Sequence, residues 1–194
     1  MNDVKRKKLL WLFASTLGIA VVAVWAIFFV RVNHAYPGAE LIQARLNEPL
    51  QYGPYTVTVS EAHIEDTTAI YKENGLSVSG KTLPEATLVC SVIIERSASD
   101  LNIQGQSDLK MLHIAATSGA WSSIVDTELY TALNKKTVAL DELRQGEKQK
   151  YLLPFGLWKD SFSKDSWSHL MERRFILQLS LYPQKREILF RITY

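Results

Sequence analysis

An uncharged stretch of 22 residues, from Leu9 to Val30, constrains this 194-residue chain more than any other feature. Ser15, Thr16 and Gly18 are the only interruptions of its apolar character. As an α-helix the stretch would be about 33 Å long, which is enough to cross a hydrocarbon layer of about 30 Å. We therefore predict a transmembrane helix over residues 9–30.

Two other interpretations of this stretch are weaker. A cleavable signal peptide has an apolar region of only about 7–15 residues, followed by small residues at the cleavage site. In this chain Ala20, Ala23 and Ala26 lie inside the run, and bulky Phe28 and Phe29 follow them. A buried helix of a soluble domain rarely carries an uninterrupted apolar run of this length. A helix that is retained in the membrane fits best.

Charges on either side of the apolar run predict its orientation. Lys5–Lys8 are all basic, whereas Arg31 alone follows the run closely. Because positive charge is enriched on the cytoplasmic side, the N-terminus should stay in the cytoplasm and the C-terminal part should lie outside. We expect a single-pass protein of the cell membrane, with a cytoplasmic stub over residues 1–8, a stalk over 31–49 and an extracytoplasmic domain over 50–194.

Charge and cysteine content narrow the function classes for this domain. Beyond residue 30 the chain carries 18 basic and 19 acidic residues, a net charge of −1 with histidine neutral. A near-neutral domain gives no electrostatic reason to expect a nucleic-acid partner. Cys90 is the only cysteine, so no intramolecular disulfide can form. Its apolar neighbours in "ATLVCSVII" favour a small buried side chain.

Alternating and β-branched segments after residue 50 predict short β-strands. Pro37-Gly38, Pro49 and Gly53-Pro54 are turn signals around the stretch before them. We expect strands over residues 55–64, 86–96, 109–117, 148–157, 174–182 and 186–194, a weaker strand around Leu76 and Val78, and short helices over 40–46, 126–134 and 163–174.

Many short strands with few helices are typical of an antiparallel β-sandwich. A parallel α/β fold would need longer helices between its strands. The last two predicted strands flank "PQK" and form the clearest hairpin in the chain. The predicted core residues are Val89, Ile93, Leu177, Leu179 and Phe190.

The segment "ELRQGEKQKYLLPF" (142–155) resembles the polar "L-x-x-G-E" turn that leads into an edge strand in small immunoglobulin-like ectodomains. Such domains hang from a lipid or transmembrane anchor on many Gram-positive bacteria. The order of anchor, stalk and a "Y-x-V-x-V" first strand is also similar. The resemblance spans residues 50–194, and the chain departs from it through the insertion "WKDSFSKDSWSHLMERR". It implies an all-β fold, an immunoglobulin-like antiparallel β-sandwich with short helical insertions, and it supplies no catalytic residues.

Candidate chemical groups in the sequence have ordinary structural explanations. Glu61, His63 and Glu65 share one side of a predicted strand, but zinc normally takes three or four ligands and the other histidines are scattered. Asp165 and His169 are spaced as a helix-stabilising pair. We therefore predict no catalytic residue, no metal site and no cofactor.

Aromatic residues crowd the insertion before the final hairpin. Trp158, Phe162 and Trp167 are interleaved with charges, and Arg173 and Arg174 follow them. These side chains either cover the open end of the sandwich or form a partner-binding patch, because tryptophan and arginine are enriched in binding hot spots. We expect one tryptophan to be structural and the other exposed. Trp158 is the expected core residue because it closes the apolar segment "YLLPFGLW".

These features favour a non-catalytic ectodomain, anchored in the lipid bilayer by one helix, that binds a partner at the cell surface. The partner would be another membrane protein or a cell-wall component. Two alternatives remain open, a cell-envelope hydrolase and a membrane-anchored immunity or self-protection protein. The hydrolase would need a converging acid, base and nucleophile, which the sequence does not offer.

Overall fold

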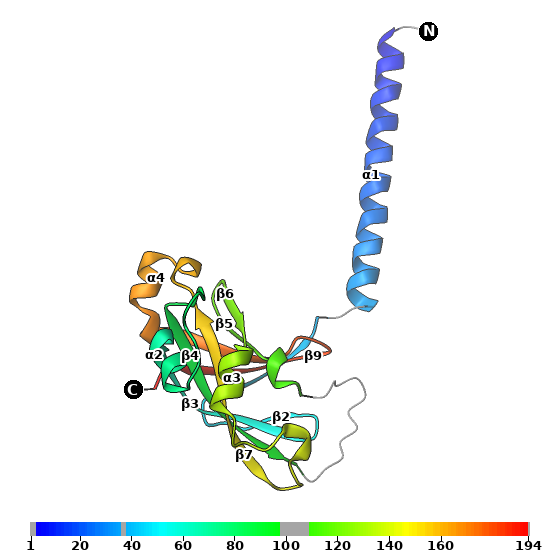
Figure 1. Ribbon diagram of the computed structural model, residues 1–194. Helices are drawn as coiled ribbons and strands as arrows, with labels where there is room; N and C mark the ends of the chain where they lie inside the picture. Colours follow the sequence, from blue (N-terminus) through cyan, green and yellow to red (C-terminus); the bar gives the residue numbers. More distant parts are fainter. Residues whose placement is uncertain (1–2, 36–37, 98–108, 194) are drawn as a thin grey trace. The chain divides into compact units, whose positions relative to one another are not determined.

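The computed structural model describes residues 3–35, 38–97 and 109–193. The chain divides into two compact units, Met1–Gly38 and Ala39–Tyr194. The first unit contains the helix α1 (Asp3–Ala35), shown in blue in Figure 1. Within α1, Ser15–Asn33 is long and apolar enough to cross a membrane and has a mean hydropathy of 2.1. An apolar N-terminal helix is therefore present where the sequence predicted one.

The second unit is built mainly from β-strands. Its strands are β1 (Glu40–Arg45), β2 (Leu50–Tyr52), β3 (Tyr55–Asp66), β4 (Ala86–Arg96), β5 (Ala115–Ser118), β6 (Trp121–Ile124), β7 (Lys148–Leu157), β8 (Arg174–Ser180) and β9 (Gln184–Arg191). Its helices are α2 (Thr67–Glu73), α3 (Thr127–Leu133) and α4 (Lys164–Ser168), with short 3₁₀ helices η1 (Met111–His113), η2 (Leu140–Glu142), η3 (Lys159–Ser161) and η4 (Leu170–Glu172).

Among the described residues, these strands form two sheets. Sheet A has the strand order β1-β9-β8-β5-β6, and sheet B has the order β2-β3-β4-β7. Every strand pair in these two sheets is antiparallel except β1–β9, which is parallel. The prediction of a purely antiparallel arrangement is therefore wrong at the β1 edge of sheet A.

The start of the folded unit also differs from the prediction. Residues 40–46 were expected to be helical because Glu, Leu, Gln, Ala and Arg are good helix formers. The segment instead pairs with β9, from Glu40 beside Gln184 to Arg45 beside Leu189. This long-range pairing overrides the local preference. The folded unit begins at Ala39, so its first strand lies inside the stretch that was predicted as a stalk over 31–49.

The strands with strong patterns agree well with the prediction. β4 and β7 have the predicted bounds, and β3 extends two residues further than expected. The hairpin of β8 and β9 is present. The expected strand over 109–117 is half wrong, because η1 occupies Met111–His113 and β5 begins only at Ala115. The segment around Leu76 and Val78 contains no strand.

The main core lies between the inner faces of the two sheets. Sheet B contributes Val57, Val59, Leu88, Cys90, Val92, Ile94, Leu153 and Phe155, and sheet A contributes Ala116, Phe175, Leu177, Ile188 and Phe190. Of the predicted core residues, Val89, Leu177, Leu179 and Phe190 are buried. Ile93 is only half-buried, because the alternation along β4 turns its neighbour Ile94 into the core instead.

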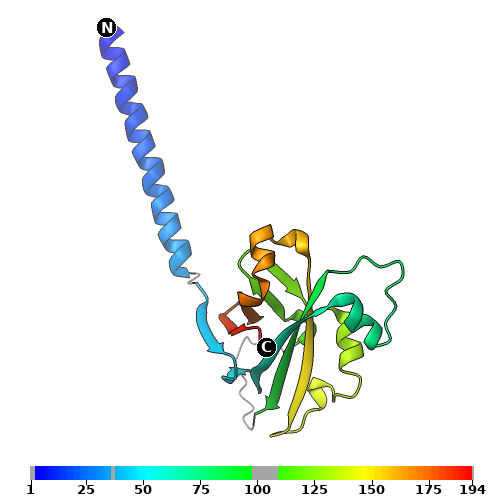
Figure 2. The same cartoon turned by 90° about the vertical axis from the view of Figure 1, so that its left-hand side faces the viewer.

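A second hydrophobic cluster covers the other face of sheet B. Val89 on β4 packs there with Ile70 and Tyr71 of α2 and with Leu129 of α3. Figure 2 shows the two helices next to each other on one side of the sheet. The sequence predicted α3, whereas α2 is an addition. The two helices thus cover the part of this face that lies around Val89.

Candidate functional site

The insertion after β7 folds into three short helical turns. η3, α4 and η4 follow one another between Lys159 and Glu172. Ser163 begins α4 as predicted, since its Oγ accepts a hydrogen bond from the backbone N–H of Ser166 at 3.1 Å. A serine at this position satisfies a backbone donor that the first helical turn leaves unpaired. The predicted helix over 163–174 is therefore present in part, as α4 and then η4.

Two of the predicted aromatic residues belong to a stack that leads into the core. The Phe162 ring centroid lies 5.7 Å from that of Trp167 and 5.8 Å from that of Trp121. Trp121 is buried and meets Phe175 edge-on at 5.9 Å. Phe162 and Trp167 are half-buried against the main core. These two rings therefore close one end of the sandwich.

Trp158 was expected in the core, and this prediction is wrong. β7 ends with Leu157 facing inward, so the next side chain points away from the core, and Trp158 is 40% exposed. The backbone N–H of the adjacent Lys159 donates to Glu85 Oε2 at 2.8 Å, and this hydrogen bond lowers the pKa of the Glu85 carboxyl. Trp158, rather than Trp167, is the exposed tryptophan.

Arg173 and Arg174, the two arginines of the predicted patch, are adjacent but differ in their contacts. Arg173 donates from Nε to Ser118 Oγ at 3.1 Å and from a terminal nitrogen to the Ser118 carbonyl oxygen at 3.3 Å. Its guanidinium also lies over the Phe162 ring, 5.7 Å from the centroid. Arg173 therefore ties the insertion to the turn between β5 and β6. Arg174 is exposed and belongs to β8.

Arg174 lies beside a surface concavity on sheet A that sequence reasoning missed. This concavity, of about 620 Å³, is lined by Gln43, Arg45, Leu46, Arg174, Leu189, Phe190 and Arg191. Its three arginines come from β1, β8 and β9. We name Arg45, Arg174 and Arg191 the arginine cluster. No local sequence pattern announces the cluster, because its members lie on segments that only the sheet brings together.

Comparison with known protein families places the second unit in a family. Residues 35–186, well over half of the chain, match the family described as Domain of unknown function (DUF5028). The chain belongs to DUF5028. The DUF5028 match begins at the last residue of α1 and therefore includes β1 in the domain. No curated protein and no solved structure matches the chain.

The DUF5028 domain brings some of the predicted polar pairs together. His63 Nε2 lies 2.7 Å from Glu65 Oε1 on the surface of β3. His169 Nδ1 lies 3.6 Å from Asp165 Oδ1 on α4, and a hydrogen bond with the Asp165 carbonyl together with nearby carboxylates raises the pKa of His169. Within the described ranges, no group of three or more His, Cys, Asp or Glu residues is arranged to hold a metal ion.

Buried titratable groups in DUF5028 are tied to packing. Burial raises the pKa of the Cys90 thiol, which lies in the main core. The Tyr71 hydroxyl donates to Asp126 Oδ2 at 2.6 Å, and burial together with this carboxylate raises the pKa of Tyr71. Asp126 Oδ1 also caps α3 by accepting from the Leu129 N–H at 3.0 Å. These contacts connect α2 to α3, which indicates a structural role for Tyr71 and Asp126.

Proposed function

We propose that this DUF5028 protein is a non-catalytic, single-pass membrane protein whose β-sandwich domain lies outside the cytoplasm and binds a partner there. The apolar segment Ser15–Asn33 supports the anchor, and the four basic residues Lys5–Lys8 before it support a cytoplasmic N-terminus. Two packed sheets with short helical insertions are compatible with an immunoglobulin-like sandwich, which is the fold class that we propose.

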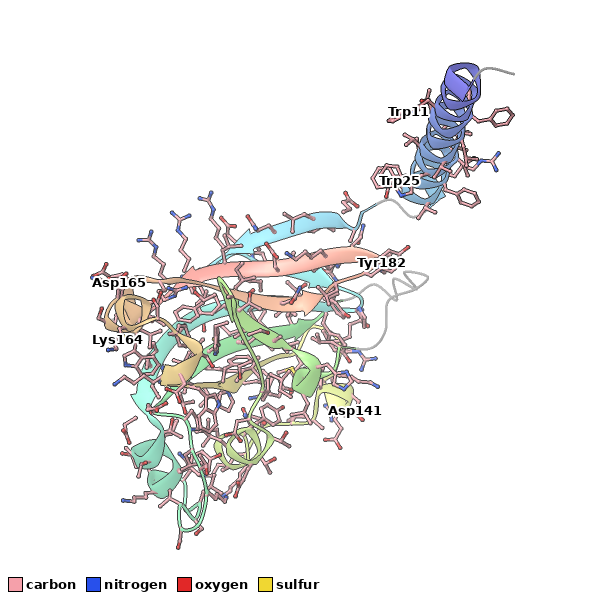
Figure 3. The ribbon with its side chains drawn as sticks, turned by 90° about the horizontal axis from the view of Figure 1, so that it is seen from above. Trp11, Trp25, Asp141, Lys164, Asp165 and Tyr182 are labelled. Atoms are coloured by element: carbon pink, nitrogen blue, oxygen red, sulfur yellow. The ribbon has the colours of Figure 1, made fainter. Side chains whose placement is uncertain are left out.

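The proposal of partner binding is supported by a difference in exposed apolar side chains between the outer faces of the two sheets. On sheet B, α2 and α3 cover the part of the outer face around Val89, whereas His63 and Glu65 of β3 remain partly exposed. On sheet A, Leu41 of β1 is 54% exposed and Ile124 of β6 is 67% exposed. Figure 3 looks onto β1 and β9, with Tyr182 at one end of the hairpin and the helix bearing Lys164 and Asp165 at the other. Leu41 and Ile124 lie on the two opposite edge strands of sheet A, so they offer a partner two separate apolar contacts on this sheet.

Reporter fusions test the topology. A reporter that is active only outside the cytoplasm should work when it is fused after Tyr194. The matched fusion carries a reporter that is active only in the cytoplasm, and it should stay silent at the same position. Activity of the cytoplasmic reporter would overturn the orientation. Mass spectrometry of the membrane fraction should also find the apolar segment retained in the mature chain.

Site-specific cross-linking tests the binding face. A photoreactive amino acid in place of Leu41 should give a discrete cross-linked product in intact cells. The matched control carries the same amino acid in place of Glu73, which is exposed on α2 beyond the covered face of sheet B. Equal products from both positions, or none from either, would contradict binding through sheet A.

A further inference from the structure

We propose that the arginine cluster is a binding site for a phosphate-bearing anionic ligand in solution or on an envelope polymer. This inference rests on the proposed function, because it names the chemistry that one partner of sheet A would carry. Arg45, Arg174 and Arg191 surround one concavity, and each comes from a different strand of the same sheet.

Strand register places the three side chains on one face. β9 lies between β1 and β8, and Arg174 of β8 is directly opposite Arg191 of β9. Arg45 is beside Leu189, which is two residues before Arg191 and therefore points to the same side of the sheet. Because adjacent strands are about 4.8 Å apart and two residues along a strand span about 6.6 Å, the three strand positions span roughly 12 Å. A single small ligand can reach all three guanidinium groups.

Within the part of the chain that the structure describes, the guanidinium groups of the arginine cluster have no ion-pair partner. Among the described residues, none of its three guanidinium groups forms an ion pair or a hydrogen bond. Other arginines do find acceptors: Arg96 donates to the Leu143 carbonyl oxygen, and Arg186 donates to the Gln51 carbonyl oxygen. Like charges directly opposite each other across two strands are destabilising. The Arg174–Arg191 pair therefore carries a cost in the free protein that a bound anion would relieve.

Nearby carboxylates are already engaged. The buried Glu187 on β9 accepts a hydrogen bond from Gln43 at 2.6 Å and pairs with Lys185 at 2.7 Å. Glu48 Oε2 accepts from the backbone N–H of Arg45 at 2.9 Å, so its carboxylate offsets part of the positive charge near Arg45. Three arginines against this one carboxylate still leave the concavity with a net positive charge for an outside anion.

Arginine chemistry favours phosphate as that anion. The guanidinium group presents a planar fork of donors that matches phosphate oxygens two at a time. A phosphate monoester carries a charge of about −1.5 to −2 near neutral pH and three acceptor oxygens. Three guanidinium groups are better matched by this density of charge and acceptors than by one carboxylate.

Calorimetric titration of the full chain in a non-ionic detergent with inorganic tripolyphosphate tests this site. The wild-type chain should bind the probe at about 0.1 M salt, where long-range electrostatics are partly screened. Arg174→Gln and Arg191→Gln should each weaken binding at least about tenfold, since each removes a charge-assisted contact. Arg174→Lys keeps the positive charge but lacks the planar guanidinium group. Its affinity for tripolyphosphate should therefore lie between that of the wild type and that of Arg174→Gln.

Arg144→Gln is the matched control. Arg144 is an exposed arginine in a different concavity, which also contains Glu142 and Glu147. Its removal changes the net charge equally and should leave tripolyphosphate affinity within about twofold of wild type. Thermal unfolding of Arg174→Gln and Arg191→Gln should show a melting temperature equal to or above that of the wild type, because each change removes a like-charge pair. If a variant loses tripolyphosphate binding but keeps a normal melting temperature, the loss of binding cannot be due to unfolding.

Four results would overturn the inference. They are absence of tripolyphosphate binding to the wild-type chain, an equal loss of affinity in Arg144→Gln, citrate binding as tight as tripolyphosphate binding, and strong competition from lipid. The last is measured in nanodiscs, where affinity should be the same in phosphatidylcholine as in mixtures with phosphatidylglycerol. Weakening in the anionic nanodiscs would assign the site to headgroups. The reporter and cross-linking tests contain no phosphate probe, so this inference and the proposed function fail separately.

Discussion

The guanidinium of Arg173 lies over the ring of Phe162 at 5.7 Å while its nitrogen atoms donate two hydrogen bonds to Ser118. One side chain thus holds the insertion, the aromatic stack and the β5–β6 turn together. Replacing Arg173 with Ala should lower the free energy of unfolding by about 1–3 kcal/mol, because the acceptors on Ser118 lose their partner. Urea denaturation of the full chain in detergent measures the change.

Arg174→Ala is the control for this prediction. It removes the guanidinium group of the neighbouring residue, which makes no ion pair or hydrogen bond within the described part of the chain. Its free energy of unfolding should stay within about 0.5 kcal/mol of wild type. If the two alanine variants were equally destabilised, the structural role of Arg173 would be wrong.

Replacement of Trp121 and of Trp158 should have very different effects on the free energy of unfolding. Trp121 is 4% exposed and contacts both Phe162 and Phe175, so Trp121→Ala should cost about 3–5 kcal/mol of stability. Trp158 is 40% exposed, and Trp158→Ala should cost no more than about 1 kcal/mol. Chemical denaturation of both variants provides the test. A large loss for Trp158→Ala would return this residue to the core.

Asp126 should matter more than Asp66, although both begin a helix. Each caps through Oδ1, Asp66 for α2 and Asp126 for α3, but only Asp126 also accepts from the Tyr71 hydroxyl. Asp66→Ala should cost about 1 kcal/mol, the usual value for a lost cap. Asp126→Ala should lower the free energy of unfolding by about 1–3 kcal/mol more than Asp66→Ala, because the buried Tyr71 hydroxyl loses its acceptor. Equal losses in urea denaturation would argue against the connection between α2 and α3.

Stability should fall in alkaline solution because of Cys90. Its folded-state pKa is raised above the ordinary value of 9.0. Below pH 9 both states keep the proton, but above it the unfolded chain ionises while the buried thiol does not, which favours unfolding. Cys90 alone should reduce stability by up to about 1.4 kcal/mol per pH unit above that point.

Urea denaturation between neutral pH and pH 10, under reducing conditions, measures this slope. Cys90→Ala lacks the thiol but keeps the tyrosines, including Tyr151, whose pKa burial raises to about 12. Its stability should therefore decline less steeply with pH than that of the wild type. Parallel declines in the two proteins would show that the thiol does not contribute.

How far the fold follows from the sequence depends on whether a segment's neighbours or distant partners decide its structure. β4 has the predicted bounds because its β-branched run favours a strand, and β7 because Pro154 and Gly156 disfavour a helix. Glu40–Arg45 has helix-forming residues, and only its pairing with β9 makes it a strand. In β4 a nearly continuous apolar run concealed the direction of each side chain. Ile94→Ala should consequently cost about 2–5 kcal/mol, and Ile93→Ala clearly less.

The candidate sites show the same division. Clustering in the sequence drew attention to Trp158, Phe162 and Trp167, but only the structure separates the exposed Trp158 from the two stacked rings. The arginine cluster has no sequence signature at all. Arg45 and Arg191 meet because the first and last strands of the domain lie side by side.

This neighbour relationship between β1 and β9 has a consequence for how the domain is made. A ribosome releases β1 first and β9 last, and the six residue pairs between them join positions 40–45 to 184–189. Contacts between such distant segments form late, since the intervening chain must be closed into a loop. The β1 edge therefore waits for nearly the whole domain to emerge. A chain that ends before Gln184 would leave β1 without its partner and would expose unpaired backbone groups along Glu40–Arg45.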